Sequence, residues 1–321
     1  MRDRGLVPRM KRRDSSPLRT KREDQDSRRS RSASQQACVT PEQVMNYRDR
    51  RYRRRKGLRL RNSRQALEFV NDVGFCWLFP AKDAEMPTLW EAICGESRPI
   101  PIQHDDQALG HAWDWKDELP SRGLVFYGKM LRAKPTLISL ELLPHFYALS
   151  QNFGDIEDYL IEYQEGRLTD EARRVYEALL KHGAMPTSHL RRHAGLEGKS
   201  SALRFDRAIR ELQLGLKIVK TGISDANSWG YCYVYDVLLR RFPDLPARAG
   251  AIHSSEAMRV LLRTFLRNVG LAGERDVARL FAWEPARLSA LSERCALAGE
   301  IARGVRVAGW PGEYLATPEV L

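Results

Sequence analysis

Apolar residues recur at helical spacing where the chain first shows a clear pattern. In residues 63–73 they fall at every third or fourth position, which predicts an amphipathic helix, and Gly74 follows where such a helix ends. Residues 75–80 are mostly apolar and predict a short buried strand or turn. A second helix is expected at 88–94, directly behind Pro87.

The pattern weakens in residues 99–128, which are rich in Pro, Gly, Asp, His and Trp. This composition predicts connecting loops with short helical pieces. Helical spacing returns at 137–150 and 156–164.

A regular order of elements begins at residue 169. Three helices are expected, at 169–182, 186–195 and 200–214, and two β-prone stretches follow at 216–223 and 229–235. Three helices followed by a hairpin is the order of a winged helix.

The same order recurs about 85 residues later. Helices are expected at 256–269, 274–281 and 285–297, and a β-prone stretch at 300–307. Together with the weaker opening segment, these repeats predict a mainly α protein with small β-hairpins (α+β), built from tandem winged-helix modules.

The division that follows has four parts. They are a disordered basic arm at 1–62, a first winged-helix-like module with an irregular insertion at 63–166, a second module at 167–245 and a third at 254–321. The arm has too few large apolar residues to offset the entropy of ordering it. Its second basic block, residues 48–56, is either a helix that forms on an anionic surface or a solvated linker, and the arm can also reflect an upstream translation start.

Charge separates the arm from the body. Residues 1–61 contain 21 Lys and Arg against 7 Asp and Glu, a net charge of +14, whereas the whole chain carries +12 and residues 62–321 therefore carry −2. The arm thus supplies long-range attraction for a polyanion, and any basic face on the body must come from local clustering.

Other chemical classes find no support in the sequence. The five cysteines are far apart without C-x-x-C spacing, so neither a metal site nor a disulfide framework is indicated, and reduced thiols fit a cytoplasmic location, with the nucleoid as an alternative. The glycines form no Walker or Rossmann pattern, which argues against a nucleotide cofactor. No run of about 18 apolar residues predicts a membrane span. We expect double-stranded DNA as the partner and no cofactor.

The second module carries the clearest candidate DNA-binding face, because the third helix of a winged helix enters the major groove and the hairpin reaches the backbone. The candidates are Arg191, Arg192, Lys199, Arg204, Arg207, Arg210, Lys217 and Lys220. The alternative is a solvated face balanced by neighbouring acids. In the third module Arg275, Arg279, Arg287 and Arg294 each lie near an acid, which is more typical of surface solubility.

Several stretches carry a resemblance to a known family. They are FVNDVGFCWLFP (69–80), PTLW (87–90), RFDRA (204–208) with EL (211–212), RTFLRNVG (263–270) and DVARLF (276–281). Over residues 63–321 the chain resembles the AlkZ-related group, akin to the AlkZ (YcaQ) crosslink-repair DNA glycosylases, which are tandem winged-helix proteins.

The resemblance also implies where catalysis would lie. Active members of that family have a Gln-x-Gln or Gln-x-Asp motif just after the first helix, and the matching positions here are Trp77 and Phe79, neither of which can orient a water. Replacement groups would come from Asp114 and Asp117, with Trp113 or Trp115 stacking on a base, unless this segment is only a surface loop.

The sequence therefore favours a DNA-binding winged-helix protein in DNA repair or damage recognition that lacks the usual catalytic motif. The alternative is an active DNA glycosylase with a rearranged site, which hydrolyses N-glycosidic bonds of alkylated or crosslinked bases. A transcription regulator is a third interpretation, although no sensor domain is evident.

Overall fold

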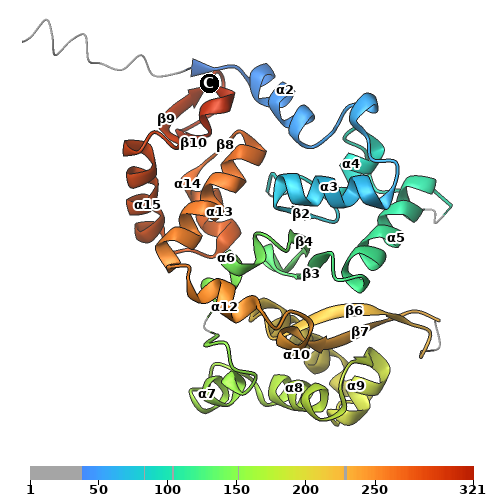
Figure 1. The fold of residues 1–321 in the computed structure, drawn as a ribbon. Coiled ribbons are helices and arrows are strands. Elements are labelled where there is room, and N and C mark those ends of the chain that lie inside the picture. Colours follow the sequence, from blue (N-terminus) through green and yellow to red (C-terminus); the bar gives the residue numbers. More distant parts are fainter. Residues whose placement is uncertain (1–37, 83, 103–104, 151, 228–229) are drawn as a thin grey trace, which may run out of the picture. The chain divides into compact units, whose positions relative to one another are not determined.

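The computed structural model describes residues 38–321, apart from 83, 103–104, 151 and 228–229 (Figure 1). In this part of the chain helices dominate, and the strands form three small sheets. The predicted fold class, mainly α with small antiparallel hairpins, is confirmed. Residues 1–37, which are most of the predicted arm, lie outside the described residues.

One succession of elements occurs three times: a helix, a short strand, two helices and two strands. In the first repeat they are α3 (Ser63–Val73), β2 (Phe75–Trp77), α4 (Leu89–Cys94), α5 (Gln107–Ser121), β3 (Val125–Lys129) and β4 (Pro135–Ser139). In the second repeat they are α8 (Asp170–His182), β5 (Met185–Pro186), α9 (Thr187–His193), α10 (Ala202–Leu214), β6 (Ile218–Ser224) and β7 (Cys232–Val237). In the third repeat they are α13 (Ser254–Val269), β8 (Leu271–Ala272), α14 (Glu274–Phe281), α15 (Pro285–Leu297), β9 (Ala302–Val307) and β10 (Tyr314–Ala316).

The three sheets share one strand order. In each repeat the first strand pairs antiparallel with the last, and the last pairs antiparallel with the middle one, giving β2-β4-β3, β5-β7-β6 and β8-β10-β9. This is the element order expected from the sequence for the second and third segments, and the first segment has it too. The module boundaries themselves stay a prediction.

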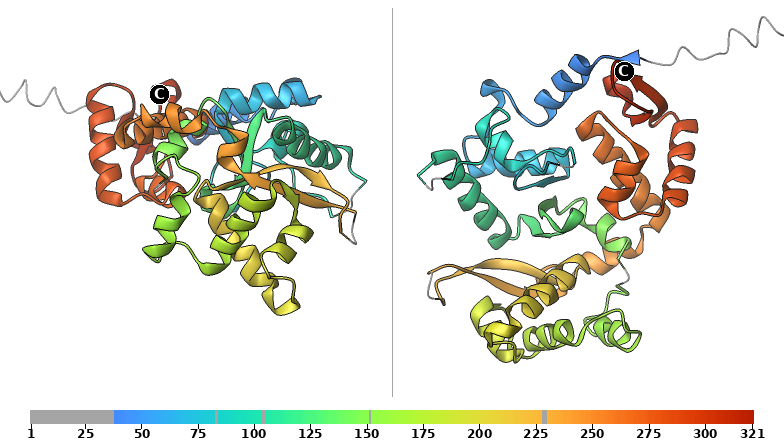
Figure 2. Two further views of the ribbon diagram at one scale, coloured as in Figure 1. Left: turned by 60° about the horizontal axis from the view of Figure 1, so that its bottom comes forward. Right: turned by 180° about the vertical axis from the view of Figure 1, so that it is seen from behind.

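Short elements connect and extend the repeats (Figure 2). They are β1 (Cys38–Val39), α2 (Pro41–Arg51), η1 (Lys56–Leu58), η2 (Leu131–Ala133), α6 (Leu143–Ala148), α7 (Asp158–Gln164), η3 (Lys199–Ser201), α11 (Leu238–Arg241), α12 (Leu245–Gly250) and η4 (Pro318–Val320). β1 pairs parallel with β9 and so adds a strand to the third sheet.

Helix α3 shows how local sequence sets the start of the first repeat. The Asn62 side chain accepts a hydrogen bond from the Gln65 N–H at 2.9 Å, which caps the helix. Gly74 ends it with a φ of +75°, and a Cβ at this position would lie 2.9 Å from the Leu142 side chain. The chain therefore turns directly into β2.

The structure corrects the expectation of disorder for residues 38–62. Helix α2 has a capping box at Thr40, and its Arg48 side chain is buried, donating to the carbonyls of Val269 at 2.8 Å and Leu271 at 3.2 Å. The Tyr52 side chain is also fully buried. The composition of this segment predicted disorder because an average over its residues hides the few apolar side chains that are buried. The acids that pair with its arginines also lie far away in sequence.

Residues 99–128 also differ from the prediction of loops. Most of them form α5 and β3, and α5 buries side chains three or four positions apart, including Ala112, Trp115 and Leu119. The helical period was hidden because Lys116 shares this buried face. Residues 137–139, expected to be helical, belong to β4, where Leu137 and Ile138 pair with both neighbouring strands and Ser139 pairs with β3.

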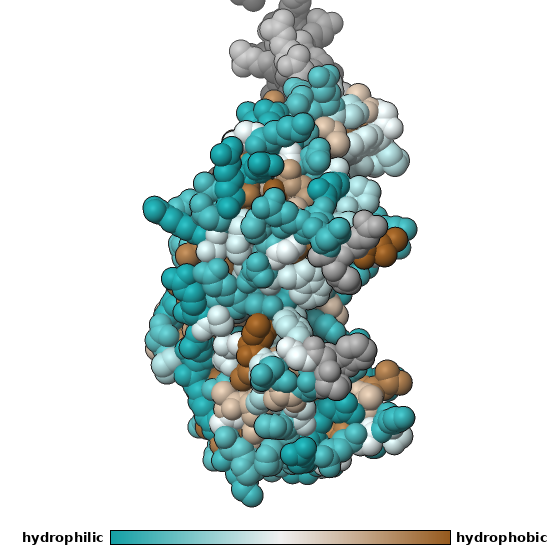
Figure 3. Space-filling view, turned by 90° about the vertical axis from the view of Figure 1, so that its right-hand side faces the viewer, coloured by the Kyte–Doolittle hydropathy of each residue, from teal (hydrophilic) through white to brown (hydrophobic). Residues whose placement is uncertain are grey.

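No helix within the described residues is long and apolar enough to cross a membrane. The face in Figure 3 is mainly hydrophilic, and its hydrophobic residues lie singly or in small groups.

Candidate functional site

The basic residues predicted on the second repeat do not form one free face. Arg192 forms an ion pair with Glu197 at 3.1 Å, and Arg204 forms one with Glu171 at 3.3 Å. Arg191 is half-buried and donates to the carbonyl of Leu196. Arg192 and Arg204 stay exposed within these pairs, and Lys199, Arg207 and Arg210 are exposed without an ion-pair partner among the described residues.

The two lysines predicted on the hairpin of the second repeat are buried, which corrects their assignment to a phosphate-contacting wing. The Lys217 Nζ lies 3.1 Å from a Glu162 carboxylate oxygen, and only 5% of the lysine side chain is exposed. The Lys220 Nζ lies 3.7 Å from the centre of the Tyr233 ring and 4.3 Å from that of Tyr127. Lys220 lies on β6, which packs against α5 and β3, and Lys217 lies just before this strand against α7, so both side chains face protein and not solvent.

Lys220 belongs to a cluster of buried polar and aromatic groups that joins the first two repeats, here called the Lys116–Lys220 cluster. The Lys116 side chain is fully buried; its Nζ donates to Asp117 at 2.6 Å and to the Tyr231 hydroxyl at 2.7 Å. The Tyr231 hydroxyl in turn donates to the other Asp117 oxygen at 2.8 Å. Lys116, Asp117 and Tyr231 thus form a closed triangle of hydrogen bonds.

The burial of this cluster changes its titration. Burial lowers the pKa of Lys220 from 10.5 to about 7, and repulsion from Lys116 adds to the effect while Asp117 opposes it. Burial raises the pKa of Tyr127 and of Tyr231 well above the usual range, so both phenols stay neutral. Lys220 is therefore poised to change charge near neutral pH.

The two positions expected from the resemblance to match the catalytic motif lie at the end of β2 and two residues after it. The Trp77 indole is 1% exposed, and its Nε1 has no hydrogen-bond partner among the described residues. Phe79 is half-buried, with its ring 6.1 Å from that of Trp90 and 6.5 Å from that of Trp113. Both side chains pack against other aromatic or apolar groups.

The acidic and aromatic candidates on α5 separate into two kinds. Trp115 is buried and stacks on His111, and Asp117 is held by Lys116 and Tyr231. Asp114 and Trp113 are exposed. Trp115 and Asp117 therefore have partners within the fold, and of the predicted tryptophans and aspartates only Trp113 and Asp114 are exposed.

A different site appears where the three repeats meet, here called the Trp283 pocket. It is a cavity of about 570 Å³, lined by the β3–β4 turn, the end of α10, α6, and the helices of the third repeat. Its residues are Met130, Leu131, Arg132, Ala133, Phe146, Leu149, Leu214, Met258, Leu261, Arg279, Leu280, Phe281, Ala282, Trp283, Glu284 and Arg287. A cavity of this size at the junction of subdomains is typical of a ligand site.

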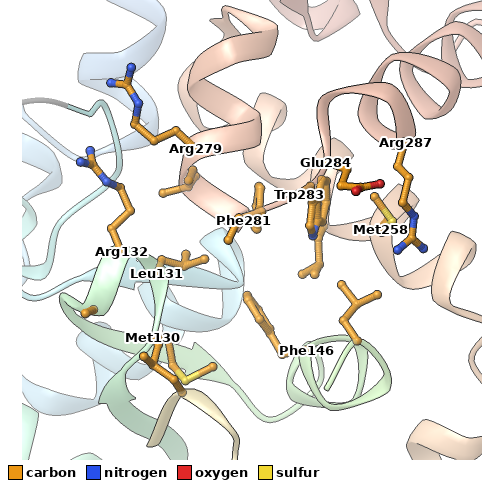
Figure 4. Close-up of a pocket in the computed structure, with 16 residues that line it drawn as sticks. Met130, Leu131, Arg132, Phe146, Met258, Arg279, Phe281, Trp283, Glu284 and Arg287 are labelled. Carbon is orange, nitrogen blue, oxygen red and sulfur yellow. The ribbon is translucent and has the colours of Figure 1, made fainter. Parts of the chain in front are cut away.

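Aromatic rings and guanidinium groups define the chemistry of this pocket (Figure 4). The rings of Phe281 and Trp283 are stacked, with centres 4.4 Å apart and planes at 15°. Arg132 and Arg279 lie on one side of this pair and Arg287 on the other. With Glu284 as the one acid among the described lining residues, the pocket carries a net charge of +2, which favours a flat ligand with negative charge.

The backbone at the pocket is held in unusual conformations. Arg132 and Ala133 have φ of +54°, and the Lys134 N–H donates to the Leu131 carbonyl at 3.1 Å, so the turn resembles type I′, which favours Asn-Gly, Asp-Gly or Gly-Gly at these two positions. Ala282, at the end of α14, has φ of +55°. Three of the five described non-glycine residues with positive φ thus line this pocket, and such strain concentrates at functional sites.

The sequence of this chain matches a known protein family. A model of the AlkZ-related family matches residues 60–282, more than half of the sequence. The chain belongs to the AlkZ-related family. The matched region of this AlkZ-related chain ends at residue 282, between Phe281 and Trp283 in the sequence. It therefore contains most of the residues that line the Trp283 pocket.

A solved structure has the same fold. The AlkZ-related chain is similar to the Streptomyces sahachiroi DNA glycosylase AlkZ with a TM-score of 0.52 and 13% identity, over 88% of this chain and 71% of that one. At this identity the likeness concerns the fold. A sequence comparison with curated proteins gives no match.

Sequence reasoning undervalued the Trp283 pocket. Arg279 and Arg287 were interpreted as surface charges because acids lie near them in sequence, and Arg132 was not singled out. The one signal available was the aromatic pair Phe281 and Trp283 between two arginines of the AlkZ-related chain. This aromatic pair becomes part of a pocket only because the β3–β4 turn, about 150 residues earlier in the sequence, lines the same cavity.

Proposed function

We propose that this protein binds double-stranded DNA and acts in DNA repair or damage recognition. Membership of the AlkZ-related family supports this proposal, as does a fold shared with a protein named as a DNA glycosylase. Three copies of a helix-helix-hairpin unit of the kind that binds DNA in winged-helix proteins add to it.

One observation carries the proposal furthest: the arginines of two repeats converge on the Trp283 pocket. Arg279 and Arg287 are exposed, and Arg132 lines the same cavity on the facing turn. Guanidinium groups held close together attract an anion, and arginine is well suited to phosphate. The exposed Lys129 and Lys134 flank this turn and extend the basic region.

Fluorescence anisotropy with a labelled duplex, titrated against salt, tests the proposal. We expect wild-type affinity to fall steeply as salt increases, because phosphate contacts release counterions. The double variant Arg279→Gln with Arg287→Gln should bind at least about tenfold more weakly at physiological salt, and its log–log salt slope should be less steep by about 2.

Two further variants serve as comparison and control. Arg207→Gln with Arg210→Gln tests whether the exposed arginines of α10 also contact phosphates. Arg64→Gln removes a charge that is 87% exposed and paired with Glu68 on α3, so it should leave binding unchanged. A salt slope near zero, or no binding at low salt, rules out DNA binding of this kind.

Activity as a DNA glycosylase is the second hypothesis, and the exposed pair Trp113 and Asp114 on α5 is the observation that keeps it open. A carboxylate beside an aromatic ring can face the sugar of a stacked nucleotide. Purified protein would be incubated with alkylated or crosslinked duplex and base release measured. Release that survives Asp114→Asn excludes this side chain as the catalyst.

A further inference from the structure

We propose that the Trp283 pocket receives one unpaired nucleotide of the bound DNA, with its base stacked on the aromatic wall and its phosphates held by the arginines. This inference rests on the proposed function, because only a protein that binds DNA takes a nucleotide from it. It adds a definite ligand, a single unstacked nucleotide, and a definite set of residues.

The aromatic wall is fixed from behind by the core. Phe281 stacks on Trp283 and meets Phe75 edge-on, with ring centres 6.0 Å apart, and Phe265 edge-on at 5.8 Å. Phe75 in turn meets Phe146 at 5.6 Å. A flat surface held this way loses little conformational freedom when a base stacks on it, and such stacking accepts any base because every base has a π face.

The rest of the wall separates this pocket from a simple phosphate site. The exposed Leu214 and the half-buried Met130, with the aromatic rings, provide apolar surface that phosphate alone would not use. The three arginines stand at the sides of the aromatic pair, not beneath it. A nucleotide has an apolar base and charged phosphates. The pocket offers apolar surface for the base and, on either side of it, arginines for the phosphates.

The size of the cavity also favours a single nucleotide. Its volume of about 570 Å³ lies within the range of roughly 300–1,000 Å³ that is common for pockets enclosing one small molecule. A base pair within a duplex presents only its edges in the grooves, so its faces cannot reach Trp283. The nucleotide must therefore leave the stack.

Extrusion makes the pocket a sensor of weak pairing. The cost of unstacking a base is smallest for mismatched, damaged or unpaired nucleotides, so a pocket that rewards extrusion prefers such sites. This preference needs no bond-breaking chemistry at Trp77 or Phe79.

Three labelled duplexes of one sequence test the inference with the full chain. The first is fully paired, the second carries one bulged nucleotide, and the third carries an abasic analogue at the same position. We expect the wild type to bind the bulged duplex about 5- to 150-fold more tightly than the paired one, the range that stacking of one base provides. The abasic duplex, equally flexible but without a base, should lack this preference.

Variants at the aromatic wall separate stacking from mere folding. Trp283→Leu keeps apolar bulk but removes the flat ring, and it should lose the preference for the bulge while still binding paired DNA. Trp283→Phe retains a ring and should keep most of the preference. Phe153→Leu removes another aromatic ring, 73% exposed between α6 and α7 and outside the pocket, and should leave the preference unchanged.

A fluorescent base analogue gives a second measurement. With 2-aminopurine as the bulged nucleotide, stacking on Trp283 should quench its emission on binding, and Trp283→Leu should abolish the quenching. Equal binding of all three duplexes by the wild type, or a preference that survives Trp283→Leu, overturns the inference and leaves the proposed function intact. Failure to bind any of the duplexes overturns both.

Discussion

Replacing Lys220 by methionine tests how the Lys116–Lys220 cluster balances burial against charge. The lysine side chain is 7% exposed, and its pKa falls from 10.5 to about 7, first because of burial and then because of Lys116. Each unit of pKa corresponds to about 1.4 kcal/mol, so keeping the charged form in the fold at pH 7 costs up to about 5 kcal/mol. Methionine has similar length and no charge.

The rings of Tyr127 and Tyr233 offset part of this free-energy cost. Cation–π contacts to Tyr127 and Tyr233 favour the charged amine by roughly 1–2 kcal/mol each. We therefore expect Lys220→Met to raise the free energy of unfolding by about 2 kcal/mol at pH 7.

The pH dependence gives the sharper test. Because the folded pKa lies below the unfolded one, the unfolded chain binds more protons between pH 7 and pH 10.5, and wild-type stability rises through this window. Lys220→Met lacks this titration, so its advantage should shrink toward pH 10.

Urea unfolding followed by circular dichroism at pH 7, 8.5 and 10 measures the difference. Lys134→Met, at an exposed position on the β3–β4 turn, is the control and should show no pH-dependent difference. A Lys220→Met protein that is less stable than the wild type at pH 7, or a difference that stays constant with pH, refutes the reasoning.

Three further predictions concern single contacts. Ala133→Gly should raise the free energy of unfolding by up to about 1 kcal/mol, and with it the melting temperature, because glycine adopts the φ of +54° without strain. A lower melting temperature contradicts this prediction. Asp117→Asn should lower the free energy of unfolding in urea by about 3 kcal/mol, because it leaves the buried Lys116 amine without its counter-charge. An unchanged urea midpoint would count against the hydrogen-bonded triangle of Lys116, Asp117 and Tyr231. Arg48→Met should cost about 2–4 kcal/mol, since two buried carbonyls lose their donor, and limited proteolysis should then cut residues 38–62 faster than in the wild type.

The fold was more predictable than the site. Helix α3 and the helices of the second and third repeats have regular apolar spacing and a glycine or cap at their ends, so a local pattern was sufficient to find them. Helix α5 was missed because its buried face includes Lys116, whose amine is held by the Asp117 carboxylate and by the Tyr231 hydroxyl, 115 positions later in the chain.

The candidate site shows the same limit more strongly. Lys217 and Lys220 carry the residue type that binds phosphate, yet both are buried against protein partners, whereas Arg279 and Arg287 are exposed although acids lie near them in sequence. Residue type alone cannot decide which cations remain available, because each ion pair depends on where distant elements come to lie.

The sequence by itself determined the fold class, the repeated order of helices and strands and the resemblance to the AlkZ-related family, since each is expressed in local spacing or in contiguous residues. The tertiary structure decided that residues 38–62 are ordered, that Trp77 lies in the core, and that an arginine-flanked aromatic pocket forms where three repeats meet. These features arise from packing between segments about 100 to 230 residues apart, and local periodicity carries no information about such contacts.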